Sequence, residues 1–526
     1  MAATRREVLL GGLALAGCGE AARPALQGGW TGASAERGHR LRAPLPRAGD
    51  GPLRRSRILI VGTGIAGLAC GRALAAAGVD DFALLELEDQ AGGNSRGHAM
   101  GGIACPLGAH YLPLPGPDAA EVYQLLEELG LVRQMLGRPV YEERHLCHSP
   151  QERLFFEGQW VEGLLPPARE ATSREQYLNF AREVESAQKQ LGFTMPTHRS
   201  RWTPGLSELD AQTFAGWLDQ RQLNDPQLRW YLDYCCRDDY GAGAAEVSAW
   251  AGLHYFASRH GFHPPGAETG EREAVLTWPE GNAWLSARMA TPLAARTHTG
   301  RTVLRVEVER YGVDVLAWNE QAQAPERWQA EQLVLATPLF IANRLLGGSL
   351  PALLAAATQL QYAPWLVSNL QLKAPLLQRL GAPLAWDNVI YGSPALGYVD
   401  ATHQSLVPSP GPTVLSAYWA LPRKQRPALL QQDWQACAKQ VIDDLATVHP
   451  DLPEQLQAAD LQRWGHAMSI PAPGIRSSSA LAALQSPQGR LHFAHADLSG
   501  YSVFEEAYTQ GTRVAAQLMA RAAASR

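Results

Sequence analysis

Three glycines follow a short apolar run at a spacing that suits phosphate binding. Gly62, Gly64 and Gly67 form the pattern G-x-G-x-x-G. The first glycine allows a sharp turn, the second leaves room for a pyrophosphate beside the backbone, and the third lets a helix pack closely against a sheet. The N-terminus of that helix would offer free N–H groups and a partial positive charge. The pattern therefore predicts a dinucleotide-binding turn.

A carboxylate follows this turn at the distance that ribose recognition requires. Glu86 lies about 20 residues beyond the last glycine, where an acid accepts hydrogen bonds from a ribose diol. An acid at this place disfavours a 2′-phosphate, so the predicted dinucleotide is FAD or NAD and not NADP. The glycines could instead serve plain tight turns, but strand, glycines, helix, second strand and acid all occur in register.

The elements that must position these residues form one βαβ unit. Residues 57–61 are mostly β-branched or aliphatic and suit a strand that is buried on both faces. Residues 65–77 have the small side chains of a closely packed helix, and Gly78 is a natural stop. Residues 82–86 suit a second buried strand. This order predicts a Rossmann-like α/β fold.

The residues after Glu86 separate FAD from NAD. Gly92 and Gly93 lie in the run ELEDQAGGNSRG. This run resembles the E-x-x-x-x-x-G-G-R segment of the flavin-containing amine oxidase superfamily, which includes polyamine oxidases, protoporphyrinogen oxidases and carotenoid desaturases. In that family the arginine meets the FAD phosphates. Asn94 takes its place here, and Arg96 could supply the charge from two residues further on. The resemblance implies FAD as the cofactor.

The resemblance continues in segments that would return to the cofactor. Gly108 and Ala109 match a loop beside the isoalloxazine ring. Val303 matches a valine that touches adenine, and Asp497 matches a carboxylate near the ribityl chain and phosphates. Gly511 is expected to open or break the helix pattern that follows, whose N-terminus would face the flavin pyrimidine. Further cofactor-binding candidates are Ala66, Val503 and Phe504.

These matches are discontinuous, which implies an FAD-binding domain in three segments. We expect that domain to comprise residues 56–115, 275–345 and 465–522. Residues 116–274 and 346–464 would form an interleaved α+β substrate domain. The length of 526 residues also exceeds the usual size of a single domain.

FAD bound in this way would take a hydride at flavin N5, while the protein orients the substrate C–H bond and excludes water. An amine nitrogen must be neutral when the hydride leaves, and the imine product hydrolyses. Tyr501, Trp464 and His466 are the candidate catalytic residues. Tyr501 lies near a position at which relatives place an aromatic ring, although Val503 could hold that slot. Trp464 and His466 belong to a segment like that of protoporphyrinogen oxidases, and each could equally be a core residue.

Other residues bear on the electron acceptor and the substrate. Many relatives carry a lysine near flavin N5, but Val367 or Ser368 occupies the expected place and Lys373 lies further along. We therefore expect a dehydrogenase that passes electrons to a cell-envelope carrier, with oxygen as the alternative acceptor. Asp238 and Asp239 could attract a cationic amine such as a polyamine, although acid pairs are more often solvated.

Three functions remain open at this point. The first is an FAD-dependent amine oxidase or dehydrogenase. The second is a flavin-dependent desaturase of an apolar substrate, which the protoporphyrinogen-oxidase-like segment 464–471 favours. The third is a lipoprotein that binds FAD or another ligand without turnover. An NAD enzyme would have no use for Gly92, Gly93 or Asp497.

The first residues resemble a targeting signal. Arg5 and Arg6 precede a modest apolar run, as in substrates of the bacterial Tat route, and an L-A-G-C run resembles a lipobox with Cys18 as the lipidated residue. An ordinary cleavable signal is the alternative. We expect residues 1–18 to be the signal and residues 19–55 to be a flexible tether. The protein would then be periplasmic and attached to the membrane only through its lipid.

Bulk composition argues against other classes of protein. The net charge of −5 gives no reason to expect a nucleic acid partner. The run HLCH at residues 145–148 has no second ligand cluster near it in the sequence, so no metal is expected. Apart from the possible lipidated cysteine, buried free thiols are the default for the cysteines.

Overall fold

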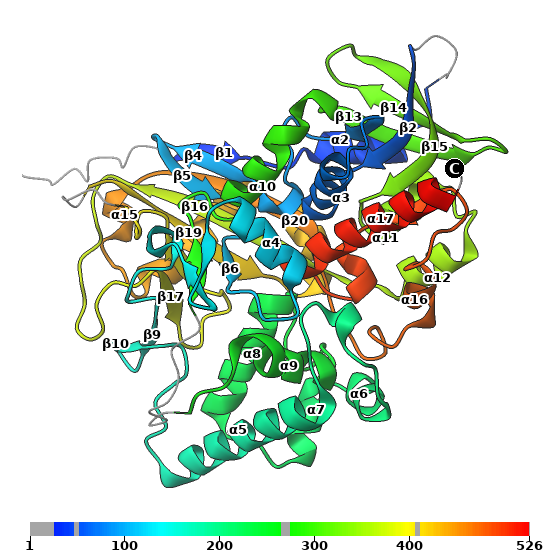
Figure 1. Cartoon of the computed structure of the whole chain (residues 1–526). Helices are drawn as coiled ribbons and strands as arrows, with labels where there is room; N and C mark the ends of the chain where they lie inside the picture. Colours follow the sequence, from blue (N-terminus) through cyan, green and yellow to red (C-terminus); the bar gives the residue numbers. More distant parts are fainter. Residues whose placement is uncertain (1–25, 47–51, 265–273, 406–410, 525–526) are drawn as a thin grey trace, which may run out of the picture.

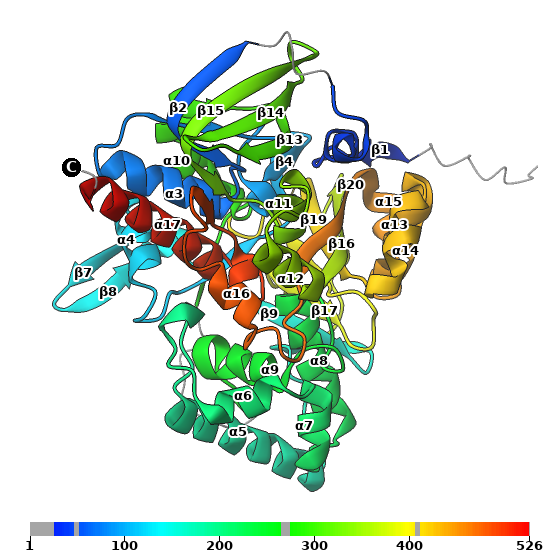
Figure 2. The ribbon, with the colours of Figure 1, turned by 90° about the vertical axis from the view of Figure 1, so that its right-hand side faces the viewer.

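The computed structural model describes residues 26–46, 52–264, 274–405 and 411–524. The expected signal of residues 1–18, including Cys18, lies outside these ranges. None of the helices in the described ranges is both long and apolar enough to span a bilayer. Figures 1 and 2 show two sheets with helices packed around them.

The first βαβ unit belongs to a seven-stranded sheet with the order β12-β3-β2-β15-β14-β13, in which β21 also pairs with β15. Pairing is parallel among β12, β3, β2, β15 and β21, and antiparallel around β14. Apart from residues 53–55 of β2, which belong to the expected tether, the strands come from segments expected to bind FAD. They are β2 (Leu53–Val61), β3 (Phe82–Leu85), β12 (Thr297–His298), β13 (Arg301–Val308), β14 (Val313–Asn319), β15 (Ala324–Leu335) and β21 (Leu491–Phe493).

A second sheet has eight strands in the order β1-β20-β16-β19-β18-β17-β9-β10. Most of its strands come from segments expected to form the substrate domain, and it is mainly antiparallel. Its strands are β1 (Gln27–Trp30), β9 (Glu152–Phe156), β10 (Gln159–Glu162), β16 (Tyr362–Leu372), β17 (Asp387–Ile390), β18 (Tyr398–Asp400), β19 (Thr413–Ala420) and β20 (Leu456–Ser469).

The strand β1 corrects part of the expected tether. Gln27 to Trp30 pair in parallel with Ala458 to Leu461 of β20, and the short helix α2 (Ala35–His39) follows. This segment consists largely of small and charged residues and has no apolar period, so its sequence pattern does not predict an ordered element. Backbone pairing and ion pairs hold the segment in place instead. The expectation of a flexible tether over residues 19–55 is therefore wrong for residues 27–42.

The helices form two groups. Helices α5 to α9 gather at one end of the molecule, away from the seven-stranded sheet (Figure 1). They are α5 (Ala171–Leu191), α6 (Pro204–Asp210), α7 (Phe214–Gln220), α8 (Pro226–Tyr240) and α9 (Ala249–Tyr255). The others cover the sheets: α3 (Ile65–Ala76), α4 (Ala120–Glu128), α10 (Ala283–Ala290), α11 (Leu339–Leu345), α12 (Pro351–Gln359), α13 (Arg426–Gln431), α14 (Trp434–Ala446), α15 (Leu452–Gln455), α16 (Ser479–Ala483) and α17 (Phe504–Ala524).

Three short hairpins or ladders complete the fold. They are β4 (Gly97–Met100) with β5 (Ile103–Pro106), β6 (Tyr111–Pro113) with β11 (Val275–Thr277), and β7 (Val132–Met135) with β8 (Arg138–Tyr141). The ladder of β6 and β11 joins the first segment of the chain to the second.

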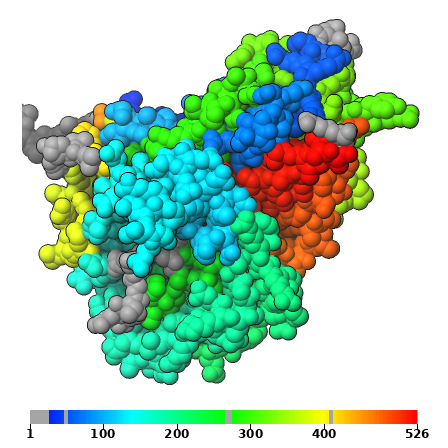
Figure 3. Space-filling model, viewed as in Figure 1, coloured from blue at the N-terminus to red at the C-terminus, as the bar shows by residue number. Residues whose placement is uncertain are grey.

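Gly511 has a different role from the expected one. Helix α17 begins at Phe504, and Gly511 lies in its interior. A Cβ atom on Gly511 would lie 2.1 Å from the Ala66 carbonyl oxygen and 2.8 Å from the Ala69 Cβ. The glycine therefore lets α17 cross α3 at backbone contact, and Figure 3 shows the two helices side by side at the surface in blue and red.

We predict that Gly511→Ala destabilises the protein by about 1–3 kcal/mol, because the added methyl group must push α17 away from α3. Denaturant-induced unfolding, followed by tryptophan fluorescence, measures this change. Gly116→Ala is the matched control, since no atom lies within 4 Å of its added methyl group. Equal unfolding midpoints for Gly511→Ala and the wild type would contradict the proposed close crossing.

Candidate cofactor and substrate site

One elongated cavity of about 460 Å³ reaches from the first βαβ unit to the C-terminal end of α8. It brings together most of the residues that the sequence singled out. These lining residues are Gly62, Gly64, Ala66, Glu86, Gly93, Asn94, Gly108, Ala109, Val303, Trp464, His466, Asp497, Val503 and Phe504. Gly67, Arg96 and Tyr501 do not line it.

Glycines leave room for a ligand beside the backbone of the turn before α3. Gly62 has a φ of 99°, and a Cβ on Gly67 would lie 2.0 Å from the Gly62 carbonyl oxygen. A Cβ on Gly93 would lie 3.0 Å from the Gly64 Cα. Gly64 is the N-cap of α3 and offers no side-chain hydrogen bond to the first turn. The open backbone N–H groups at this helix N-terminus suit the two phosphates of FAD.

Glu86 is held in one orientation at the edge of this turn. One carboxylate oxygen accepts hydrogen bonds from the backbone N–H, at 3.0 Å, and the hydroxyl of Thr63. The other oxygen accepts from the Glu88 N–H at 2.9 Å. A carboxylate has lone pairs left after these bonds, so it can still accept from a ribose diol.

Arg96 corrects the expectation that it could supply charge directly to the phosphates. The guanidinium Nε donates to the Gly93 carbonyl oxygen at 3.1 Å, and the group lies 5.7 Å from the centre of the Trp464 ring. Arg96 thus contacts the glycine loop at Gly93 and does not line the cavity. Asn94 does line the cavity, and its amide donates to the Ala467 carbonyl oxygen at 2.6 Å.

Asp497 is a fully buried acid in the middle of the cavity. Its Oδ2 accepts from the Leu339 N–H at 2.9 Å and from the Tyr362 hydroxyl at 2.6 Å. Burial opposes ionisation, but His495 at 3.2 Å and these hydrogen bonds hold the pKa of Asp497 below its usual range. The His495 contact is made to Oδ1. This oxygen keeps lone pairs that suit a hydroxyl of the FAD ribityl chain.

His466 packs against the tyrosine that donates to this acid. Its ring is 4.7 Å from the ring of Phe340 and 5.8 Å from that of Tyr362, which donates to Asp497. Burial lowers the pKa of His466 to about 4, so the imidazole is neutral. Its packing against Tyr362, the partner of Asp497, favours a role at the cofactor over a role at the substrate.

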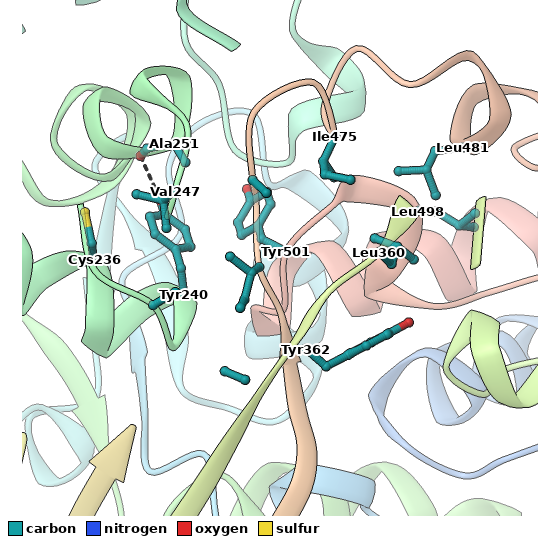
Figure 4. Packing of buried hydrophobic residues seen from close by; sticks show 14 of the residues in the cluster. Cys236, Tyr240, Val247, Ala251, Leu360, Tyr362, Ile475, Leu481, Leu498 and Tyr501 are labelled. Atoms are coloured by element: carbon teal, nitrogen blue, oxygen red, sulfur yellow. Dashed lines mark hydrogen bonds between the residues drawn. The ribbon is translucent and has the colours of Figure 1, made fainter. Parts of the chain in front are cut away.

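Tyr501 is buried in the core, which makes its assignment as a catalytic residue wrong. Its hydroxyl donates to Glu506 at 2.9 Å, and its ring contacts Tyr240 and Trp250 at 5.8 and 6.0 Å. Figure 4 shows Tyr501 among apolar side chains near Tyr240. The chain turns at Gly500, whose φ is 84°, so Val503 faces the cavity instead.

The far end of the cavity has aromatic walls that sequence reasoning missed. His110 stacks on Tyr418 with ring centres 4.3 Å apart, and the Tyr418 hydroxyl donates to the Gly108 carbonyl oxygen at 3.1 Å. Trp365 of β16 is paired in register with Trp464 of β20. In a sequence, an aromatic residue on a strand that lines a cavity cannot be told from one in the core. The one available signal for this wall was the position of His110 directly after the Gly108–Ala109 loop.

The acidic corner of this end is formed by Asp238, Asp239, Arg259 and Glu505. Asp239 pairs with Arg259 at 2.7 Å, and Glu505 approaches the same guanidinium at 3.6 Å. Among the described residues, Asp238 accepts a single long hydrogen bond of 3.4 Å, from the Tyr111 hydroxyl. Burial, and then the neighbouring Asp239, raises the pKa of Asp238 to about 7. One arginine thus faces three carboxyl groups.

Val367 lines the cavity, whereas Ser368 is buried and not part of the lining. Within the described ranges, no group of three or more ligating side chains could hold a metal ion. His145 of the HLCH run instead accepts a hydrogen bond from the Trp278 indole at 3.0 Å. The cysteines in those ranges are all free.

Comparison with known proteins agrees with this geometry. The family model for flavin-containing amine oxidoreductases matches residues 65–519. An L-amino acid dehydrogenase of Synechocystis is 22% identical over 463 residues, covering 84% of this chain and 89% of that protein. A putrescine oxidase of Kocuria rosea is 30% identical over 167 residues, 31% of each chain.

Solved structures with the same fold include two amine oxidases. A putrescine oxidase bound to putrescine superimposes with a TM-score of 0.67 at 19% identity, over 89% of this chain and all of that one. Cyclohexylamine oxidase from Brevibacterium oxydans gives a TM-score of 0.63 at 18% identity, over 88% of this chain and 98% of that one. At these identities the likeness concerns the fold.

We predict that Glu86→Gln raises the dissociation constant for FAD about 10- to 100-fold, because the amide offers the ribose one acceptor fewer and no charge. Titration of apoprotein with FAD, followed by flavin fluorescence, measures the constant. Glu307→Gln, an exposed change on β13, should bind FAD like the wild type. Unchanged affinity in Glu86→Gln would show that this acid does not contact the ribose.

Proposed function

The chain belongs to the family of flavin-containing amine oxidoreductases, and on this premise we propose that it oxidises a cationic amine, with a polyamine or diamine as the preferred class. FAD, when bound, accepts a hydride from the carbon next to the substrate nitrogen. The other product is an imine, which water hydrolyses to a carbonyl compound and a free amine. The non-catalytic lipoprotein considered from the sequence is set aside, because the family consists of oxidoreductases.

The observation that carries the proposal is the unpaired acid at the cavity. In the described part of the chain, no basic side chain forms an ion pair with Asp238, because Arg259 is bound to Asp239. The carboxyl group reaches the cavity next to a second acid. A bound cation would replace the missing partner and favour the ionised form of Asp238. A neutral substrate would leave that acid without compensation.

The aromatic walls complement this charge. The rings of His110, Tyr418 and Trp365 can cover the methylene chain of an amine and exclude water from the reacting carbon. Burial lowers the pKa of His110 to about 4. The imidazole is therefore neutral at physiological pH and does not repel a cation.

A substrate with two nitrogens fits the two demands of the reaction. The nitrogen at the reacting carbon must be neutral when the hydride leaves, whereas the acid at Asp238 attracts a charged group. A diamine or polyamine can meet both demands with different nitrogens. The putrescine oxidases among the similar proteins act on a molecule of this kind, as their names state.

An amino acid substrate is the second candidate. Arg259 lines the cavity, and its Nε has no hydrogen-bond acceptor among the described residues. It could therefore bind a substrate carboxylate, and one similar protein is an L-amino acid dehydrogenase by name. The two carboxylates already close to Arg259 weaken its attraction for a third, so we favour the amine. An apolar substrate of a desaturase ranks lower, because it leaves Asp238 unpaired.

For the oxidative half of the cycle, we propose transfer of electrons to a cell-envelope carrier instead of oxygen. Val367 lines the cavity where many relatives carry a lysine. The expected signal in residues 1–18, with lipidation of Cys18, would place the enzyme at the periplasmic side of the bacterial membrane, near such carriers.

We predict that Asp238→Asn lowers kcat/KM for putrescine and spermidine about 10- to 100-fold, because the charge that binds the substrate is lost. Anaerobic bleaching of the flavin in a stopped-flow instrument gives the rate. Asp118→Asn, an exposed change, is the matched control. Faster reduction by L-amino acids than by amines, with no effect of Asp238→Asn on it, would favour the second candidate.

The same variant has a distinct pH profile. Because the pKa of Asp238 is raised to about 7, its carboxylate is present above this pH and is lost as the pH falls below it. The kcat/KM of the wild type for polyamines should therefore rise through about pH 7, and this step should be absent in Asp238→Asn. A step of equal size in both proteins would assign it to another group.

We also predict that the reduced enzyme reacts faster with a soluble quinone than with dissolved oxygen. The measurement mixes anaerobically reduced protein with each acceptor and follows recovery of the flavin absorbance. Rapid recovery with oxygen alone would refute the assignment as a dehydrogenase and leave the proposal for the amine substrate intact.

A further inference from the structure

We infer that residues 27–42, here called the N-terminal strap, close the adenosine end of the FAD site and retain the cofactor. Gly38 and Leu41 of the strap line the cavity together with Glu86 and Val303. Glu86 is the acid expected at the ribose, and Val303 is the residue that the family resemblance places at the adenine. The strap therefore adds a wall to the part of the site where the adenosine would lie.

The start of the strap is fixed to the eight-stranded sheet. Beyond the ladder of β1 and β20, the Thr31 N–H donates to the Leu461 carbonyl oxygen at 2.9 Å, and the Ala33 N–H donates to the side chain of Gln462 at 2.7 Å. Figure 2 shows β1, in dark blue, beside β20, in orange. This end of the strap thus belongs to the sheet that carries Trp464 and His466.

The middle of the strap is bound to the residues directly after Glu86. The Ser34 N–H donates to the Glu88 carboxylate at 2.8 Å. The Arg37 guanidinium donates to the Leu87 carbonyl oxygen at 3.2 Å and to the Asp89 carboxylate at 3.0 Å. The strap therefore lies over the loop that positions the ribose-binding acid.

The end of the strap is bound to the seven-stranded sheet. Arg40 donates from Nε and Nη2 to the two carboxylate oxygens of Glu320, at 2.8 and 3.0 Å, and its guanidinium lies 5.0 Å from the centre of the Trp318 ring. Arg344 donates to the Leu41 carbonyl oxygen at 3.0 Å. A two-pronged pair of this kind has a defined geometry and is stronger than a single surface contact.

The strap thus spans both sheets at the edge of the core, against which the partly buried side chains of Trp30 and Leu41 pack. No residue of α2 is buried, so polar contacts hold the middle of the segment. Such a segment can detach without unfolding the core. Dissociation of the adenosine end would require this detachment, so the contacts of Arg37 and Arg40 should slow the release of FAD.

Reversal of the charges in the Arg40–Glu320 ion pair tests this inference. The measurement is the rate of FAD release, which does not depend on turnover. Holoprotein is diluted into an excess of an apoflavoprotein that captures free FAD, and the rate of release is followed by fluorescence. Arg40→Glu and Glu320→Arg should each release FAD about tenfold faster, because an attractive pair becomes repulsive. The double variant, which restores the pair in the opposite sense, should return to within about threefold of the wild type.

The matched control is Arg57→Glu, which disrupts an ion pair of 3.5 Å with Glu331 on the seven-stranded sheet, away from the strap. It should release FAD at the wild-type rate. Release at the wild-type rate from both single variants would overturn the inference, as would equal acceleration in Arg57→Glu. If a charge reversal prevents folding, Arg40→Gln serves in its place with the same expected direction.

Hydrogen exchange provides a second test on the unaltered protein. Amides of residues 27–42 should exchange more slowly in the FAD-loaded protein than in the apoprotein, because FAD would pack against the strap. Equal exchange in both forms would show that the strap does not sense the cofactor and would overturn the inference.

Discussion

The site depends on backbone-to-backbone contact around the N-terminus of α3. Gly67 lets this helix approach the turn at Gly62, and Gly93 lets the next loop approach Gly64. On the outer side, Gly511 brings α17 to within contact of Ala66. Each contact excludes even a methyl group, so the phosphate cradle is fixed from three directions. The acids at Glu86 and Asp497 can then be placed relative to one rigid helix end.

The same cavity holds two buried acids whose pKa values move in opposite directions. Asp497 accepts hydrogen bonds from Tyr362 and the Leu339 N–H and lies beside His495, so it stays ionised. Asp238 has only a long contact with Tyr111 and a second acid as its neighbour, so its pKa is raised to about 7. The cofactor end thus keeps a fixed charge, whereas the charge at the substrate end responds to its occupant and to pH.

The cofactor half of the site was predictable from sequence because its geometry imposes local spacing. Glycines at Gly62, Gly64 and Gly67 and an acid at Glu86 follow from the distance between a turn and the next strand. The substrate half is assembled from β16, β19, α8 and the π-helical segment Phe256–His260 that carries Arg259, which no spacing connects. The assignment of Tyr501 as a catalytic residue was wrong because the cavity wall is formed two residues further on, by Val503, whereas the Tyr501 ring is buried. The strap was missed because polar contacts with Glu88 and Glu320 leave no apolar pattern.

Strand β20 links these parts through a change of register. It pairs with β1 near Ala458 and with β16 at Trp464, and the pairing shifts between Ala363 and Trp365 of β16. Within this bulge, the consecutive residues His466 and Ala467 both border the cavity. Insertions or deletions in this strand would therefore misalign the strap, the aromatic wall and the phosphate end together. The length of β20 is therefore constrained by three parts of the site at once.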